Sequence, residues 1–142
     1  MHFIMIYYKN MNIKKMKIVI DYWKKTAQHD YDTMITLFEN KRYSDSLFYG
    51  HIVLEKILKA HVVRKTKKQA PYIHNLLTLK NLANLHVSNK EIDLLDMVNS
   101  FNIRARYPEQ RLEFYKRCTK KYAEEYIGQI KSLYKKLCQK PM

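Results

Sequence analysis

The sequence contains very little glycine, proline or cysteine. Only 2 glycines, 3 prolines and 2 cysteines occur among its 142 residues. A sheet of many strands needs turn residues at its connections, so this composition argues against such a fold and favours a few long helices. The length fits one domain that buries roughly two-thirds of its unfolded surface.

Long apolar runs are also missing. No stretch approaches the roughly 18 apolar residues that cross a bilayer, and the short apolar N-terminus precedes its basic residues, the reverse of the order in a signal peptide. Cys118 and Cys138 fall on one predicted helix, about 30 Å apart and beyond the roughly 7 Å reach of a disulfide. We therefore expect no membrane association, and free thiols in a reducing cytoplasm.

The common signatures of metal and enzyme sites are absent as well. The sequence has no CxxC, HExxH or GxSxG motif and no glycine-rich phosphate loop. His51 and Glu55 stand one helical turn apart, as metal ligands often do, but no other residues complete a ligand set. The sequence therefore predicts neither a metal nor a cofactor.

Basic residues greatly outnumber acidic ones. The chain has 27 Lys and Arg against 13 Asp and Glu, which gives a formal charge of +14 and a pI near 9.7. Such a charge attracts polyanions, so nucleic acid or a nucleotide phosphate is the first partner to consider. A basic composition that serves only solubility is the alternative, and both interpretations stay open here.

Apolar residues recur at helical spacing in five segments. The segments cover approximately residues 18–40, 44–66, 75–85, 88–101 and 110–139. No strand or internal repeat is indicated, so we expect an all-α, up-and-down antiparallel bundle of about five helices. Residues 17–142 form the predicted domain, and residues 1–16 form an N-terminal arm.

Caps and breaks define several helix ends. Ser44 offers a hydroxyl N-cap to the second helix, and Ser88 with Glu91 has the spacing of a capping box. The residue before Pro108 is pushed out of helical geometry, so residues 102–108 are predicted to form an extended connection. The stripe of the last helix begins with Leu112, which we expect to face the core.

Several charged residues interrupt the apolar stripes. Asp30 lies on the inner face of the first helix, where a lone carboxylate needs a cation or donors from a neighbouring helix. Glu55, Lys56 and Lys59 form a charged band in the second helix, and His51 shares the face of Glu55. This band can be a structural polar network that ties two helices together, or the polar floor of an anion-binding cleft.

A second basic group stands before the last helix. In an extended connection, Arg104 and Arg106 would point the same way and could hold phosphate oxygens with two guanidinium groups. Tyr107 beside them could stack on a base. Alternatively, Arg106 pairs with a buried acid and Tyr107 fills the core.

Several short motifs follow one another along the chain. They are Tyr22-Trp23, Asp30, Leu54-Glu55-Lys56, Leu58-Lys59-Ala60, His74-Asn75-Leu76 and Arg104-Ala105-Arg106-Tyr107-Pro108. In this order they resemble the HEPN domain family, from about residue 21 to residue 137. The family usually has an aspartate where this chain has Asn75, which weakens any inference of an acidic role there.

The resemblance implies a bundle of about five helices, usually dimeric, with a polar cleft that binds a nucleotide or RNA. In bacteria such proteins often act beside a minimal nucleotidyltransferase, as a toxin–antitoxin or two-component pair. We therefore expect a homodimer, a nucleotidyltransferase partner and a nucleotide or RNA phosphate as ligand. Carried over to this sequence, the candidate binding residues are Asp30, Glu55, Lys56, Lys59, His74, Arg104, Arg106 and Tyr107.

Active ribonucleases of this family share an arginine followed, after four to six residues, by a histidine. None of the arginines of this chain has a histidine in that window. The resemblance therefore implies a non-catalytic module that binds a nucleotide or RNA. Two alternatives are a divergent, metal-independent ribonuclease that uses His74 with Arg104 or Arg106, and a purely structural dimerisation protein.

Overall fold

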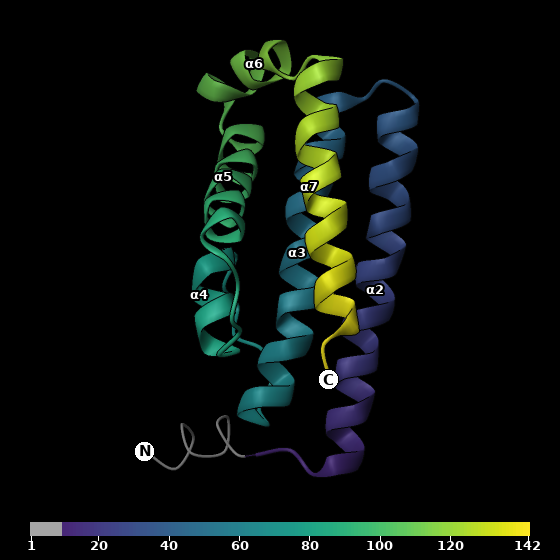
Figure 1. The fold of residues 1–142 in the computed structure, drawn as a ribbon, viewed down its shortest axis with the longest axis vertical. Coiled ribbons are helices and arrows are strands. Elements are labelled where there is room, and N and C mark those ends of the chain that lie inside the picture. The colour runs from purple at the N-terminus through teal and green to yellow at the C-terminus, as the bar shows by residue number, and fades with distance from the viewer. Residues whose placement is uncertain (1–9) are drawn as a thin grey trace.

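A computed structural model describes residues 10–142, and within them all regular structure is helical (Figure 1). This confirms the all-α bundle. The helices are α2 (Ile13–Glu39), α3 (Tyr43–Thr66), α4 (Leu76–Leu82), α5 (Asn89–Arg106), α6 (Pro108–Arg117) and α7 (Lys120–Gln139).

The first described helix begins earlier than the sequence predicted. Asn12 caps α2 because its side chain accepts a hydrogen bond from the backbone N–H of Lys15 at 2.8 Å. The predicted arm of residues 1–16 is therefore helical from Ile13 onward, while residues 1–9 lie outside the described residues.

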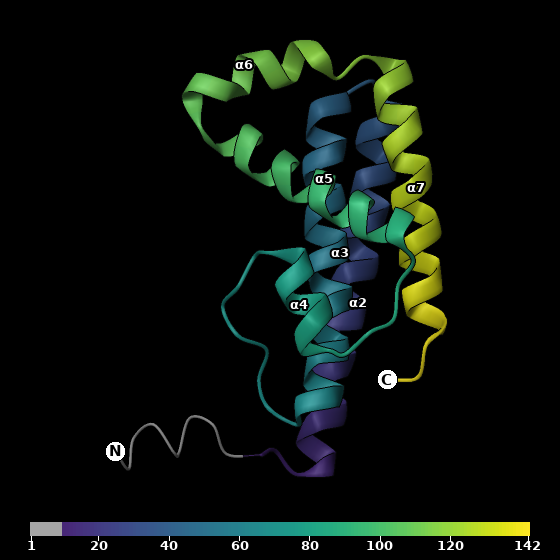
Figure 2. The same ribbon diagram turned by 60° about the vertical axis from the view of Figure 1, so that its left-hand side comes forward.

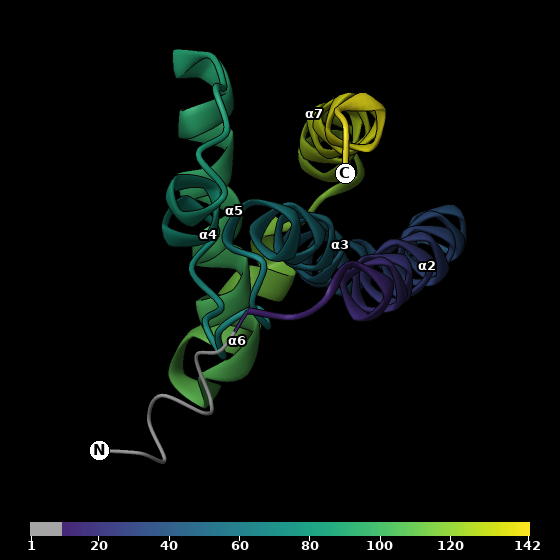
Figure 3. The same cartoon turned by 90° about the horizontal axis from the view of Figure 1, so that it is seen from below.

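Helix α3 forms the centre of the bundle. It contacts α2, α7, α5 and α4, and Figure 3 shows it between α2 on one side and α4 with α5 on the other. Its buried residues cover most of its circumference, as expected for a helix that is apolar on several sides.

Among the helices of residues 10–142, none is long and apolar enough to span a membrane.

The extended connection predicted for residues 102–108 is wrong. Helix α5 continues to Arg106, and Tyr107 alone adopts an extended conformation, with φ −87° and ψ 124°. Pro108 then takes the first position of α6. A proline restricts only the residue before it and is favoured at the start of a helix, so one residue is enough for the break.

The long last helix is also divided. Helix α6 ends at Arg117, and α7 begins at Lys120 because the Thr119 side chain accepts a hydrogen bond from the backbone N–H of Tyr122 at 3.2 Å. Helix α6 crosses the end of the bundle, away from the direction of α7 (Figures 1 and 2). The expectation that Leu112 faces the core is therefore wrong, since its exposed fraction is 62%, and Phe114 is the buried residue of α6.

One of the two predicted N-caps is confirmed. Ser88 and Glu91 form a complete capping box at the start of α5. Ser44 does not cap α3, which begins one residue earlier and has Arg42 at its N-cap without a side-chain hydrogen bond. Cys118 and Cys138 are free thiols as expected, although they do not share one helix.

The two glycines provide a matched test of the packing between α3 and α7. A Cβ at Gly50 would lie 2.7 Å from Cδ1 of buried Ile130, while one at Gly128 would meet nothing within 4 Å. Both replacements by alanine favour the helix by about 1 kcal/mol. We expect Gly128→Ala to raise the free energy of unfolding. The free energy of unfolding of Gly50→Ala should be lower than that of Gly128→Ala by about 1–3 kcal/mol, because the added methyl group clashes with Ile130. Urea denaturation of both variants measures this difference, and equal stabilities would contradict the close approach of the two helices.

Candidate anion-binding site

Asp30 is held by a cation from the neighbouring helix, as its burial required. It is 8% exposed on α2, and Nζ of Lys56 on α3 donates a hydrogen bond to its Oδ2. Nδ1 of His29 lies 3.3 Å from the other carboxylate oxygen. The buried charge is thus paired, and the pair ties α2 to α3.

Glu55 is the centre of a second polar network. Lys59 donates to its Oε2 at 3.0 Å, and Nδ1 of His74, from the loop before α4, lies 2.9 Å from its Oε1. The Lys59 side chain is only 6% exposed, and its ammonium group lies 5.3 Å from the ring centroid of Trp23. Both carboxylate oxygens are therefore occupied, and the network joins α3 to the loop that leads into α4.

His51 is a buried neutral member of the same region. Its side chain is 2% exposed, and Nε2–H donates to the backbone carbonyl of His74 at 2.9 Å. Burial lowers the pKa of His51 to about 4, although Glu55, 3.8 Å away, opposes that shift.

Arg104 and Arg106 do not point the same way, in contrast to the prediction. Both are helical, and two residues of an α-helix differ by about 200° around its axis. Arg106 lies 5.9 Å from the ring centroid of Phe48 and donates to Oδ1 of Asn102 at 2.9 Å. The alternative arrangement is not observed either. Arg106 forms no ion pair with an acid among residues 10–142, and Tyr107 is 55% exposed rather than buried in the core.

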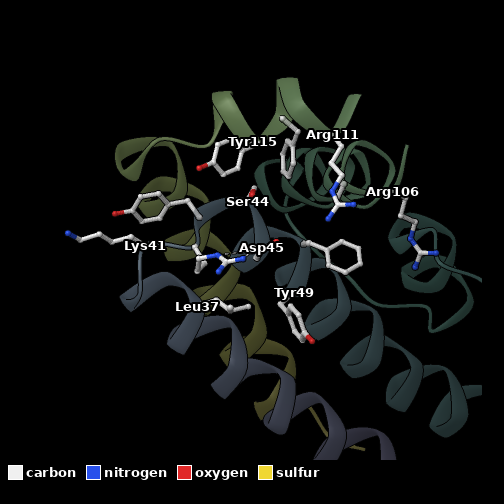
Figure 4. Close-up of a pocket in the computed structure, with 13 residues that line it drawn as sticks. Leu37, Lys41, Ser44, Asp45, Tyr49, Arg106, Arg111 and Tyr115 are labelled. Carbon is white, nitrogen blue, oxygen red and sulfur yellow. Dashed lines mark hydrogen bonds and ion pairs between the residues drawn. The ribbon is translucent and has the colours of Figure 1, made fainter. Parts of the chain in front are cut away.

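Arg106 contributes to a pocket of about 960 Å³ that Figure 4 shows in close-up. The pocket lies between the turn that joins α2 to α3, the start of α3, the end of α5 and α6. Its lining is basic and aromatic: Leu37, Lys41, Arg42, Tyr43, Ser44, Asp45, Phe48, Tyr49, Ala105, Arg106, Arg111, Phe114 and Tyr115.

The charges of this pocket are unbalanced. Asp45 is its one carboxylate, and the guanidinium group of Arg42 lies 3.0 Å from it. The side chains of Lys41 and Arg111 form no hydrogen bond or ion pair with a residue that the structure describes, and the side chain of Arg106 bonds only to the neutral side chain of Asn102. Three cations therefore line the pocket without an ion pair to a described residue, and Figure 4 shows Lys41 pointing away from Arg106 and Arg111. The volume is typical of small-molecule sites.

The candidate residues predicted from the sequence fall into separate places. Asp30 pairs with Lys56, and Glu55 contacts both Lys59 and His74. Arg106 lines the pocket described above, whereas Arg104 lines a second pocket beside α6. Tyr107 is exposed between α5 and α6. Sequence reasoning missed Lys41 and Arg111 as members of a site. Within residues 10–142, no group of three or more His, Cys, Asp or Glu side chains lies close enough together to hold a metal ion.

A family model described as HEPN domain matches residues 20–140. Neither the curated proteins nor the solved structures contain a match to the chain.

The buried state of His51 predicts a pH dependence of stability. An unfolded histidine has a pKa near 6.5, so between about pH 6.5 and 4 the unfolded chain binds a proton that folded His51 does not. The free energy of unfolding should therefore fall as the pH is lowered through this window, by up to about 3 kcal/mol for this residue. His51→Gln keeps a donor near the carbonyl of His74 but cannot take up a proton. We expect a shallower decrease in urea denaturation at pH 7, 5.5 and 4.

His86→Gln is the matched control, because it removes an exposed histidine. Part of the decrease of the free energy of unfolding with falling pH should persist in both variants, since burial also lowers the pKa of His61. Parallel stability curves for wild type and His51→Gln would contradict the assignment.

Proposed function

This chain belongs to the HEPN domain family, and we propose that it is a non-catalytic module that binds the phosphate of a nucleotide or RNA in the pocket beside α6. The observation that carries the proposal is the presence of three cations, from Lys41, Arg106 and Arg111, that line one pocket without an ion pair to any described residue. A phosphate supplies the charge that these side chains lack.

Arg106 is well suited to hold a phosphate group. Its Nε donates to Asn102 and its guanidinium plane lies near the ring of Phe48, so the fork is positioned before a ligand arrives. The terminal guanidinium nitrogens form no other hydrogen bond with described residues, which leaves them available for bidentate contact with phosphate oxygens. Tyr43 and Tyr115 line the same pocket and offer ring surfaces to a base.

Three observations favour binding without hydrolysis. The sequence lacks the arginine and histidine pair of the active members, and no histidine is among the residues that line the pocket. His51 is buried and its Nε2–H is committed to a backbone carbonyl. Proton transfer to a 2′-hydroxyl or a leaving group therefore has no histidine at this position.

Family membership also supports two partners. The protein is proposed to act as a homodimer in the cytoplasm and to serve a minimal nucleotidyltransferase, as members of toxin–antitoxin pairs do. Exposed apolar side chains on α5 and α6, from Ile103 and Leu112, are 48% and 62% exposed and provide surface that a protein partner could cover.

Removal of a pocket cation should weaken nucleotide binding. We expect Arg111→Gln and Arg106→Gln each to lower the affinity for adenosine monophosphate by about tenfold at low salt, since each removes a charge-assisted contact. Isothermal titration calorimetry measures the affinity. Lys135→Gln is the control, because it removes one exposed charge from α7, outside the pocket.

If wild type and Arg111→Gln bound the nucleotide equally well, the pocket would not be the site. If wild type bound neither adenosine monophosphate nor inorganic phosphate, the structural dimerisation alternative would replace this proposal.

One observation favours the alternative of a ribonuclease. Oε1 of Glu55 lies 2.9 Å from Nδ1 of His74, and the His74 side chain is 37% exposed. The imidazole ring therefore resembles a general base that a carboxylate orients. No arginine completes the network, however, since the cation on the other oxygen of Glu55 is Lys59.

The two functions differ in what His74 does. For a binding module, purified wild type and His74→Ala should both leave a fluorescent RNA uncut, because neither has the proton carrier beside the phosphate pocket. Gel electrophoresis of the RNA after incubation without added metal measures cleavage. Cutting by wild type that disappears in His74→Ala, with an unchanged circular dichroism spectrum, would establish the enzyme instead.

A further inference from the structure

Helix α6 has a basic pocket on each side. Besides the pocket of about 960 Å³ described above, a second one of about 540 Å³ is lined by Arg104, Gln110, Glu113, Phe114, Lys116 and Arg117. Phe114 lines both pockets, so the two adjoin each other along α6. Figure 2 shows this helix at the end of the bundle, with no other described helix beyond it.

The second pocket also has unpaired positive charge. The side chains of Arg104, Lys116 and Arg117 form no hydrogen bond or ion pair within residues 10–142, although Glu113 is part of the lining. Like charges that lie close together repel one another and raise the free energy of the folded state. A bound anion would relieve that repulsion, as in the first pocket.

One phosphate group is too small to contact the basic side chains of both pockets. Apart from Phe114, pockets of about 960 and 540 Å³ have no lining residue in common. A ligand that reaches both must carry several phosphates on a chain that bends over the helix. Two exposed tyrosines lie near the pockets: Tyr107 at the junction of α5 and α6, and Tyr115 in the lining of the first pocket, with exposed fractions of 55% and 67%.

We infer that the two pockets together hold a segment of single-stranded nucleic acid that crosses α6, with phosphates on both sides and bases against the exposed tyrosines. This inference depends on the proposed function of the first pocket and adds Arg104, Lys116 and Arg117 as a second site. A single strand is favoured over a duplex because its bases are free to stack on aromatic rings. Its backbone also bends more easily over so narrow a helix.

The inference predicts that affinity depends on ligand length. Labelled oligouridylate and oligodeoxythymidylate of one to about eight nucleotides are titrated into the full chain and followed by fluorescence anisotropy. The octamer should bind at least about tenfold more tightly than the mononucleotide. Its affinity should also fall more steeply with salt, because each additional phosphate contact adds about 0.7 to the slope of log K against log salt.

Arg104→Gln and Arg117→Gln test the second pocket directly. Each should lower the affinity for the octamer by about tenfold and leave that for adenosine monophosphate within about twofold, whereas Arg106→Gln should weaken both ligands. Lys135→Gln, which removes the same charge from α7, should change neither by more than about twofold. Thermal melts of each variant confirm that the fold is retained.

The outcomes separate the two claims. If adenosine monophosphate binds but the octamer binds no more tightly, or if Arg104→Gln and Arg117→Gln have no effect on the octamer, the second site is overturned and the proposed function stands. If no ligand binds, the proposed function itself fails. A duplex of equal length and polyglutamate are tested as competitors of the labelled octamer. If either one displaces it as effectively as unlabelled octamer, the assignment to a single strand is overturned.

Discussion

The Glu55 carboxylate, whose side chain is only 14% exposed, is the constraint on which much of the arrangement depends. It stands on the central helix α3, and its charge is tolerated because Lys59 and His74 occupy both of its oxygens. The contact between Nδ1 of His74 and Oε1 of Glu55, 2.9 Å apart, joins the loop that carries His74 to α3. That loop leads into α4, which contacts both α3 and α5. The position of α5, and of the arginines near its end, is therefore linked to the neutralisation of one charge.

The same pairing explains where the net positive charge of the molecule can act. In the polar networks of α2 and α3, the lysines have carboxylate partners, as with Lys56 and Asp30. Around α6 the situation is reversed, because the cations of both pockets outnumber the acids and most of them form no ion pair with described residues. A high overall charge is a weak indication of function, whereas unpaired cations in a concave, aromatic pocket indicate an anion site. We therefore place the proposed binding at the α6 end of the bundle rather than in the polar network.

Much of the fold could be predicted from the sequence, because helical periodicity and caps act over a few residues. The capping box of Ser88 and the need of Asp30 for a cation follow from local spacing and from the cost of burying charge. The pocket could not be predicted in this way. Apolar residues continue at helical spacing through Thr119, so periodicity alone does not reveal the end of α6. The direction of α6 depends on tertiary contacts such as that of Phe114 with Phe101, whose ring centroids are 5.5 Å apart.

The end of α5 also determines how many phosphates the protein can address. Had the chain become extended after Phe101, Arg104 and Arg106 would project to one side and could hold a single phosphate between them. Because the helix continues to Arg106, the two side chains diverge by about 200°, and Arg106 lines the pocket of about 960 Å³ while Arg104 lines the one of about 540 Å³. One extended residue, Tyr107, and the proline that follows it start α6 directly after Arg106. A short local signal thus assigns the two arginines to two pockets that share Phe114, and a ligand must present more than one negative charge to reach both.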